Sequence, residues 1–315
     1  MLNRRHLRVR VLQTLYAYES SEIKEVGKFE KSLLSSIEQV YTMYLWALNL
    51  LEEVADFATI DAEERANKYI PNEDDLQVNT KLVSNTFIEM LRRNEAYQEG
   101  VKKYKISWSF DPEIAKSVFN QLKTKPEYKE YLIQEDRSIA VEKDIIKFIF
   151  RKIILTLPVV DQAFEEKFIN WPIDKEILQA MFAKTLKNFS YEVPSKNKLA
   201  PLSPNWQEDR IFALELLTHN IRFQDDYLNL ITEKTQNWET ERIALLDVLL
   251  MRMAICELLN FPSIPVKVTM NEYIDIAKEF STPKSNTFIN GILDKVLIDL
   301  QKSGRIRKNE RGMVG

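Results

Sequence analysis

The sequence has few of the residues that usually build catalytic centres or covalent cross-links. Its 315 residues include one cysteine and two histidines. No intramolecular disulfide can form, which is typical of a protein from a reducing compartment. No glycine-rich phosphate loop and no paired metal-ligand spacing is present. Cys256 lies in an apolar helical stretch, where an inert core thiol is expected rather than a nucleophile paired with His219. We therefore expect neither an enzyme nor a bound cofactor.

Long hydrophobic runs are also missing. The longest uncharged apolar run, residues 41–51, is too short to span a bilayer. Residues 2–10 carry too many charges for a signal peptide. The sequence therefore predicts a cytoplasmic protein with no membrane partner.

Glycine is scarce, with six in the whole chain. Gly291 is the one that falls inside a strong helical pattern, where glycine costs about 1 kcal/mol relative to alanine. The compensation we expect is close packing against another helix, and contact with a partner or ligand is the alternative.

What the sequence does contain is helical periodicity. Apolar residues recur at helical spacing over 29–57, 82–105, 144–156 and 176–189, and the alternation typical of strands is absent. Asp111 is expected to cap a further helix, and residues 59–80 to form a loop. Residues 191–206 hold three prolines and are expected to form a linker. The sequence predicts an all-α fold.

Positive charge is concentrated at the two chain ends. The net charge is −3, yet residues 1–10 and residues 301–315 each carry a surplus of four positive charges, which leaves −11 between them. Arg4 and Arg8 share one face of a helix over 3–19 with Val11 and Leu15. We expect the apolar half of this stripe to pack on the core and the arginines to project beyond it, where guanidinium forks suit phosphates. The alternative is that basic ends are simply solvated.

Two further helices are predicted near the C-terminus. Thr269 and Glu272 have the spacing of a capping box, and that helix should end at Phe280. Thr282 and Pro283 are expected at the start of the next helix. Gly304 should end it.

These two helices resemble the C-terminal signature of the NusB transcription antitermination factors. N-E-Y-I-D-I-A-K-E-F at 271–280 and F-I-N-G-I-L-D at 288–294 match the family pattern, with the turn between them kept. R-R-H-L-R-V-R-V-L-Q-T-L-Y at 4–16 is similar to the family's arginine-rich RNA-binding opening. The stretch from Trp238 to Leu258 resembles another family helix, with Asp247, Arg252, Ala254 and Glu257 matching.

The resemblance implies a NusB-like helical bundle with an inserted or duplicated helical subdomain. Residues 1–22 and 205–303 would form the bundle, 23–204 the insertion, and 304–315 a disordered basic tail. The segments at 166–171 and 233–238 share four of six residues. The insertion is thus either a diverged half-copy of the bundle or an unrelated helical segment with a chance match.

The function implied is binding of single-stranded boxA-type RNA in rRNA leader transcripts, together with the ribosomal protein NusE and, indirectly, the RNA polymerase elongation complex. Asp247 and Glu257 are matched positions expected to face the protein partner, with ordinary capping and ion pairing as the alternative. Lys284 departs from a position that is often acidic in the family. The expected RNA-binding residues are Arg4, Arg5, His6, Arg8, Arg10, Gln13, Tyr16, Lys278, Lys284 and Phe288.

The sequence leaves three alternatives open. The first is a NusB-like adaptor in rRNA maturation that binds RNA or protein. The second is an RNA-binding module like those fused to rRNA cytosine methyltransferases, although no methyl-donor site follows it here. The third is a purely protein-binding helical scaffold whose working surface is the insertion.

Overall fold

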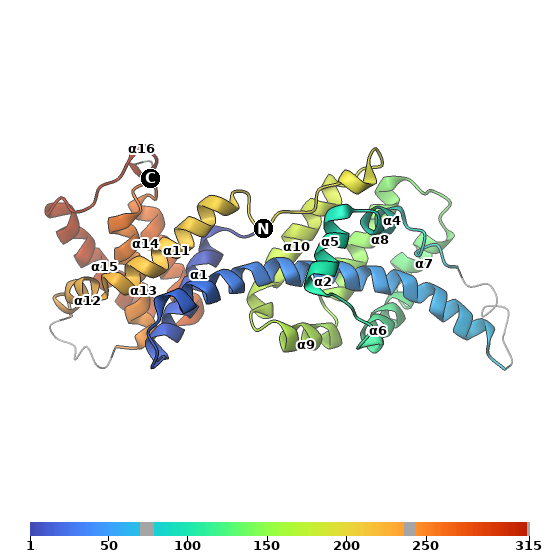
Figure 1. The fold of residues 1–315 in the computed structure, drawn as a ribbon, viewed down its shortest axis with the longest axis horizontal. Coiled ribbons are helices and arrows are strands. Elements are labelled where there is room, and N and C mark those ends of the chain that lie inside the picture. The colour runs from blue at the N-terminus through green and yellow to red at the C-terminus, as the bar shows by residue number, and fades with distance from the viewer. Residues whose placement is uncertain (70–78, 236–242, 314–315) are drawn as a thin grey trace. The chain divides into compact units, whose positions relative to one another are not determined.

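The computed structural model describes residues 1–69, 79–235 and 243–313. Throughout these residues the regular structure is helical and no strand occurs, which confirms the predicted all-α class (Figure 1). No helix among them is long and apolar enough to cross a membrane. The second copy of the possible repeat, at 233–238, extends beyond the described residues after Thr235.

The chain divides into two compact units. The first contains Met1 and residues 38–204, and the second contains residues 2–37 and 205–315. The break at Pro204 coincides with the end of the predicted insertion. The N-terminal segment of the second unit continues to Ile37 rather than to residue 22. The long helix α2 (Val26–Ala66) supplies residues to both units.

The first unit is a set of short helices around the later part of α2. The predicted helix at 82–105 is interrupted, because the side chain of Asn94 caps a new helix by accepting from the backbone N–H of Tyr97. After α2 come α4 (Thr86–Arg92), α5 (Glu95–Tyr104), α6 (Pro112–Lys123), α7 (Pro126–Ile133), α8 (Ile139–Phe148), a π-helix (Ile149–Ile154), α9 (Pro158–Lys167), α10 (Trp171–Asn188) and a 3₁₀ turn (Pro194–Lys196).

The core of the first unit combines stacked aromatics with one satisfied buried carboxylate. The rings of Phe150 and Phe182 stack at 3.8 Å between centroids. Glu142 is fully buried, and its oxygens accept from Arg137 Nε at 2.9 Å and from the backbone N–H of Thr86 at 2.9 Å. A buried charge is tolerable only when it is paired and hydrogen-bonded in this way.

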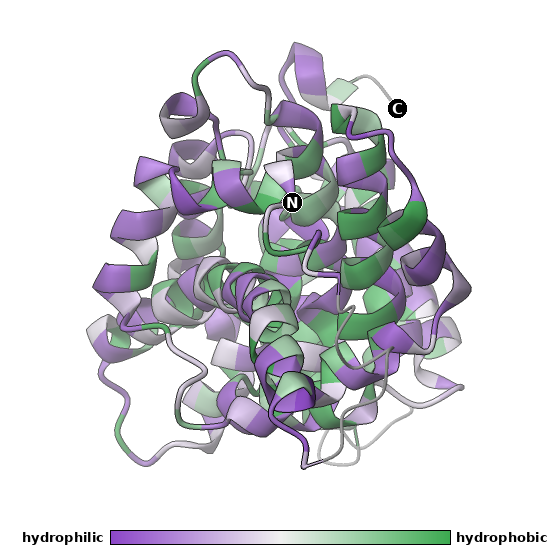
Figure 2. Cartoon of the chain, turned by 90° about the vertical axis from the view of Figure 1, so that its right-hand side faces the viewer, coloured by the Kyte–Doolittle hydropathy of each residue, from purple (hydrophilic) through white to green (hydrophobic). Residues whose placement is uncertain are grey.

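The second unit is organised around α13 (Leu245–Asn260), which is buried along most of its length. Its neighbours include α1, far away in the sequence, as well as the later helices coloured yellow to red in Figure 1. Figure 2 shows hydrophilic and hydrophobic residues on the same helices in the part of the chain that faces the viewer, as expected for amphipathic helices that share a core. The helices packed on α13 are α1 (Arg4–Ser20), α11 (Trp206–Arg222), α12 (Gln224–Thr232), α14 (Val266–Phe280) and α15 (Ser285–Lys302).

The helix ends in this unit correct two predicted caps. Helix α14 begins at Val266, so Thr269 lies inside it and forms no capping box with Glu272. Helix α15 begins at Ser285, after a turn in which the backbone N–H of Ser285 donates to the carbonyl of Thr282 at 2.9 Å. The predicted ends of both helices, at Phe280 and before Gly304, are confirmed.

Residues 304–313 form an ordered extension, which corrects the expectation of a disordered tail over the described part. Gly304 has a φ of +65°, and the N–H of Arg305 donates back to the carbonyl of Leu300 at 3.0 Å, as in a Schellman motif. Further on, Asn309 N–H donates to the carbonyl of Pro262 at 3.1 Å. Lys308 Nζ donates to the carbonyl of Phe261 at 2.9 Å and so satisfies a free acceptor at the end of α13.

Candidate RNA-binding site

The site predicted from the sequence begins with the capped first turn of α1. Asn3 Oδ1 accepts from the backbone N–H of His6 at 3.1 Å, and His6 Nδ1 accepts from the N–H of Asn3 at 3.3 Å. This reciprocal pair is a capping box. Burial, together with the positive charges of the chain terminus, Arg10 and Arg5, lowers the pKa of His6 to about 4. His6 is therefore neutral at pH 7 and adds no charge to the surface.

Arg8 is buried, which corrects the expectation that it projects beyond the core. Its Nε and Nη2 donate to the two carboxylate oxygens of Glu257 on α13, each at 2.8 Å. Thr269 Oγ1 and Tyr273 OH donate to the same carboxylate at 2.8 and 3.1 Å. Burial disfavours the charge of Arg8, but the hydrogen bonds and negative charge of Glu257 outweigh this and raise its pKa. This fully satisfied pair ties α1 to α13 and α14.

Arg4 and Arg5 remain partly exposed, with side-chain exposures of 31% and 40%. Arg4 pairs with Glu208 on α11, and its guanidinium lies 4.9 Å from the centre of the Phe212 ring. Arg5 Nε donates to Glu272 at 3.0 Å, and its Nη2 donates to Asp275 at 3.0 Å. These two guanidinium groups, unlike that of Arg8, are accessible to solvent.

The other predicted residues of α1 divide between core and surface. Arg10 is buried, and its Nη1 donates to Gln13 Oε1 at 3.2 Å. Gln13 is partly exposed, and the Tyr16 ring is 48% exposed and accessible for stacking. We call Arg4, Arg5, Arg8 and Arg10 the N-terminal arginine cluster from here on.

The predicted residues of α14 and α15 lie at the surface. Lys278 is exposed and donates to Asp275 at 3.0 Å, so Asp275 bridges it to Arg5. The structure thus brings Lys278 to the exposed part of the N-terminal arginine cluster. Lys284 is exposed and Phe288 partly exposed, and both belong to the first turn of α15 or its cap.

Asp247 and Glu257 do not face solvent, which corrects the expectation that they contact a protein partner. Glu257 is completely buried in the pair with Arg8. Asp247 is 6% exposed, lies in the first turn of α13 and accepts from Ser281 Oγ at 2.5 Å. The structure instead fits the alternative expectation: Asp247 lies in the first turn of α13, and Glu257 forms an ion pair with Arg8.

Sequence reasoning missed the acceptors that hold the cluster. The spacing of Glu272 and Asp275 predicts that they share a helix face, since they lie one turn apart. No local pattern links either residue to Arg5. A second missed pair joins α13 to the end of α1, where Arg252 Nη1 donates to Glu19 at 2.6 Å. In the sequence Arg252 stands out as a match to the family pattern, but no local pattern links it to Glu19.

Gly291 lies on an open surface of α15. A Cβ atom built at this position meets no atom of the described residues within 4 Å. The expected close packing against another helix is therefore wrong, and contact with a partner or ligand stays a prediction.

These features define a class of protein: an all-α bundle around a buried central helix, with arginines of the first helix ion-paired to acids of the neighbouring helices. Among the described residues there is no group of three or more His, Cys, Asp or Glu side chains that could hold a metal ion. Residues 175–297 match the model of the NusB family, from α10 through most of α15. The chain therefore carries a NusB-family domain.

Individual relatives support this assignment. A transcription antitermination protein NusB from Salinibacter ruber is 43% identical over 106 residues, which are 34% of this chain and 66% of the relative. The protein of that name from Chloroherpeton thalassium is 40% identical over 103 residues, 33% of this chain and 49% of the relative. A third, from Finegoldia magna, is 41% identical over 91 residues, 29% of this chain and 66% of the relative.

The chain thus spans about half to two thirds of the length of these relatives. The family match starts 30 residues before the predicted boundary at 205, and it does not include α1. No solved structure matches the chain.

Proposed function

We propose that the protein is a non-enzymatic transcription antitermination factor that binds single-stranded, boxA-type RNA together with the ribosomal protein NusE, and through them acts on the RNA polymerase elongation complex. The observation that carries this proposal is the NusB-family domain, three of whose relatives bear the name of transcription antitermination proteins. A cytoplasmic location and a role in rRNA transcription are parts of the same proposal.

The accessible cations support an RNA contact at the start of α1. Arg4, Arg5 and Lys278 are partly or fully exposed, and each is paired with an exposed or partly exposed acid. Such surface pairs contribute only about 0–1 kcal/mol each, so an RNA phosphate can displace the carboxylate at little cost. Arginine forks match phosphate geometry, and Tyr16 offers a ring for an unpaired base.

Arg8 supports this contact from below the surface. Its Nη1 also lies 3.4 Å from Glu272, the carboxylate that holds Arg5. We infer that Arg8 positions α1 and the acids around Arg5, and that it does not bind phosphate itself.

The test compares RNA affinity across salt concentrations for matched arginine variants. Arg4→Ala/Arg5→Ala is expected to weaken binding of a boxA-type RNA and to lower the salt-dependence slope by about 0.7 for each lost phosphate contact on a single strand. Arg93→Ala is the control, because Arg93 is an exposed arginine of the first unit whose ion pair is with its helix neighbour Glu89. An unchanged slope in the double variant contradicts the assigned site, and no RNA binding by the wild type contradicts the function.

NusE binding is tested separately, by titrating purified NusE against the wild type with and without the RNA. We expect the RNA and NusE to increase each other's affinity for the protein by the same factor, since coupling between two ligands is reciprocal. Binding of NusE with no effect of RNA would instead favour a protein-binding scaffold.

A further inference from the structure

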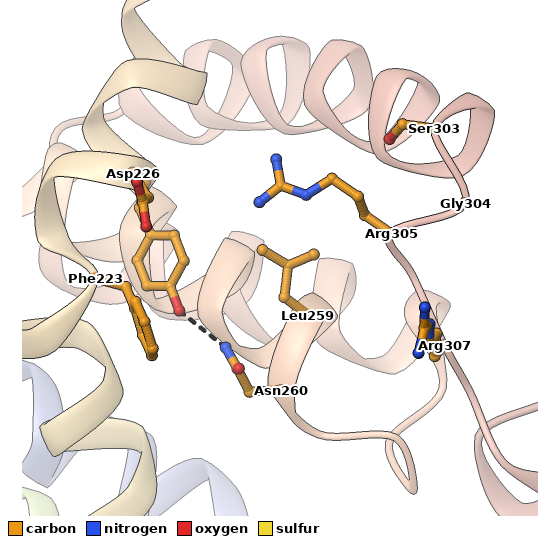
Figure 3. A pocket seen from close by; sticks show the side chains of 9 residues that line it. Phe223, Asp226, Leu259, Asn260, Ser303, Gly304, Arg305 and Arg307 are labelled. Atoms are coloured by element: carbon orange, nitrogen blue, oxygen red, sulfur yellow. Dashed lines mark hydrogen bonds between the residues drawn. The ribbon is translucent and has the colours of Figure 1, made fainter.

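A pocket outside the predicted site lies between α12, the end of α13 and the ordered C-terminal extension. Its volume is about 420 Å³, within the usual range for small-ligand sites. Figure 3 shows the side chain of Arg305 directed toward the space between Asp226 and Leu259. The lining residues are Phe223, Asp226, Tyr227, Leu259, Asn260, Ser303, Gly304, Arg305 and Arg307.

The arginine side chains that line this pocket are available to bind a ligand. Arg305 and Arg307, which we call the tail arginines, are exposed, and neither guanidinium has a hydrogen-bond or ion-pair partner in the part of the chain that the structure describes. A third guanidinium, that of Arg222, lies 5.2 Å from the centre of the Phe223 ring. Asp226 is the one carboxylate among the lining residues. The rim of the pocket therefore attracts an anion.

The wall opposite the tail arginines suits a flat, partly apolar group. Phe223 and Tyr227 are neighbours, with ring centroids 6.2 Å apart, and Leu259 lies beside them in the lining. Asn260 Nδ2 donates to Tyr227 OH at 2.8 Å and to the carbonyl of Cys256 at 3.0 Å, which fixes the tyrosine ring. Tyr227 is 2% exposed and backs the wall, so the partly exposed ring of Phe223 is the one that can stack against a nucleobase.

The extension holds the tail arginines in place. The Schellman motif at Gly304 sets the direction in which the chain leaves α15, and the bonds of Lys308 and Asn309 to the end of α13 fix the chain beyond Arg307. Gly312 is needed at its position, because an added Cβ would lie 2.1 Å from the carbonyl oxygen of Pro262. The pocket is thus a consequence of the docked extension.

We propose that this pocket binds one nucleotide, with its phosphate on the tail arginines, its base against the Phe223–Tyr227–Leu259 wall, and a base amino group donating to Asp226. A carboxylate that accepts from an amino group is a known element of base recognition. Where the bound nucleotide is part of an RNA strand, the inference rests on the proposed function, and the pocket is a second binding site for that strand. The same chemistry also fits a free nucleotide.

The experiment uses the full chain and two sets of probes: single-stranded RNA of the boxA type and the four 5′-nucleoside monophosphates. Arg305→Ala/Arg307→Ala is compared with Arg311→Ala, since Arg311 is an exposed arginine of the same extension that does not line the pocket. We expect the double variant to lower the salt-dependence slope for RNA by about 0.7 for each arginine that contacts a phosphate. The Arg311 variant should match the wild type.

Two further variants test the base contact. Phe223→Leu is expected to weaken binding about fivefold or more, the usual effect of losing a stacked base. Asp226→Asn is expected to change the order of preference among the four monophosphates, because an amide both donates and accepts where a carboxylate only accepts. Folding of each variant is checked by circular dichroism.

Each outcome of these titrations either supports or overturns the proposed nucleotide site. Monophosphate binding that is lost in the tail-arginine variant identifies a free-nucleotide site, and an effect on RNA alone identifies a contact with the strand. If the double variant and Arg311→Ala behave alike with both probes, the pocket inference is overturned. That result does not contradict the proposed function, because the proposed function depends on Arg4 and Arg5. Variants of these two residues are measured in the same titrations.

Discussion

The two ends of the second unit use arginine in opposite ways. In the N-terminal arginine cluster, Arg4, Arg5 and Arg8 are paired with carboxylates of α11, α13 and α14. The tail arginines lie beside one carboxylate and are paired with none among the described residues. Similar surpluses of positive charge in the sequence thus correspond to different structures. The first holds helices together, and the second leaves its donors available.

This difference predicts that one end tolerates substitution less than the other. A guanidinium whose partner is buried cannot be removed without leaving that partner charged and unpaired in the core. A guanidinium at the rim of an open pocket can be removed with little effect on the fold, since surface substitutions away from special contacts usually change stability by less than about 0.5 kcal/mol. The predictions below test this contrast, beginning with the largest expected effect.

Arg8→Ala is expected to lower the free energy of unfolding by about 3–5 kcal/mol, the usual cost of breaking a buried ion pair by removing one partner. Glu257 would keep Thr269 and Tyr273 as donors but lose both bonds from the guanidinium. Urea denaturation measures the change, with Arg4→Ala as the control expected below about 1 kcal/mol. Equal losses in the two variants would show that burial does not distinguish them.

Gly312→Ala is expected to undock the extension that carries the tail arginines. The added Cβ cannot coexist with the Pro262 carbonyl, and overpacking of this kind costs about 1–3 kcal/mol. The readout is the rate of tryptic cleavage after Arg305 and Arg307, which should rise about 5- to 100-fold if the extension opens. Unchanged cleavage would mean that the extension is not held by the contact at Gly312.

Gly291→Ala is expected to raise the free energy of unfolding by about 0.5–1 kcal/mol, because alanine favours helix and its Cβ meets nothing here. Helix α15 leads into the tail arginines, so a firmer helix should leave their pocket intact. Thermal and urea unfolding measure the gain. A loss of stability would revive the close packing expected from the sequence.

The helical class, the ends of α14 and α15 and the cap role of Gly304 could be predicted because they depend on neighbouring residues. The burial of Arg8 could not, because its partner lies 249 positions away. The apolar residues on the same helix face do indicate its burial, since Val11 and Leu15 are fully buried. The order of the C-terminal extension depends on Pro262 and Phe261, which are distant in sequence and give no local pattern.

The last prediction concerns the pH dependence of stability and rests on His6, the neutral residue in the first turn of α1. Its pKa is lowered from 6.5 to about 4 in the folded protein, so folding favours the uncharged ring. This contribution is fully present above pH 6.5 and is lost progressively as the pH falls toward 4, where the unfolded chain binds a proton that the folded chain does not. Carboxylates titrate in the same range, so the measurement is the difference in unfolding free energy between wild type and His6→Gln across pH 4–7. Glutamine stays uncharged and is a residue of natural capping boxes, so it serves as a pH-independent reference. The difference should shift against the wild type as the pH falls. A difference that stays constant with pH would mean that the His6 ring titrates alike in the folded and unfolded chain.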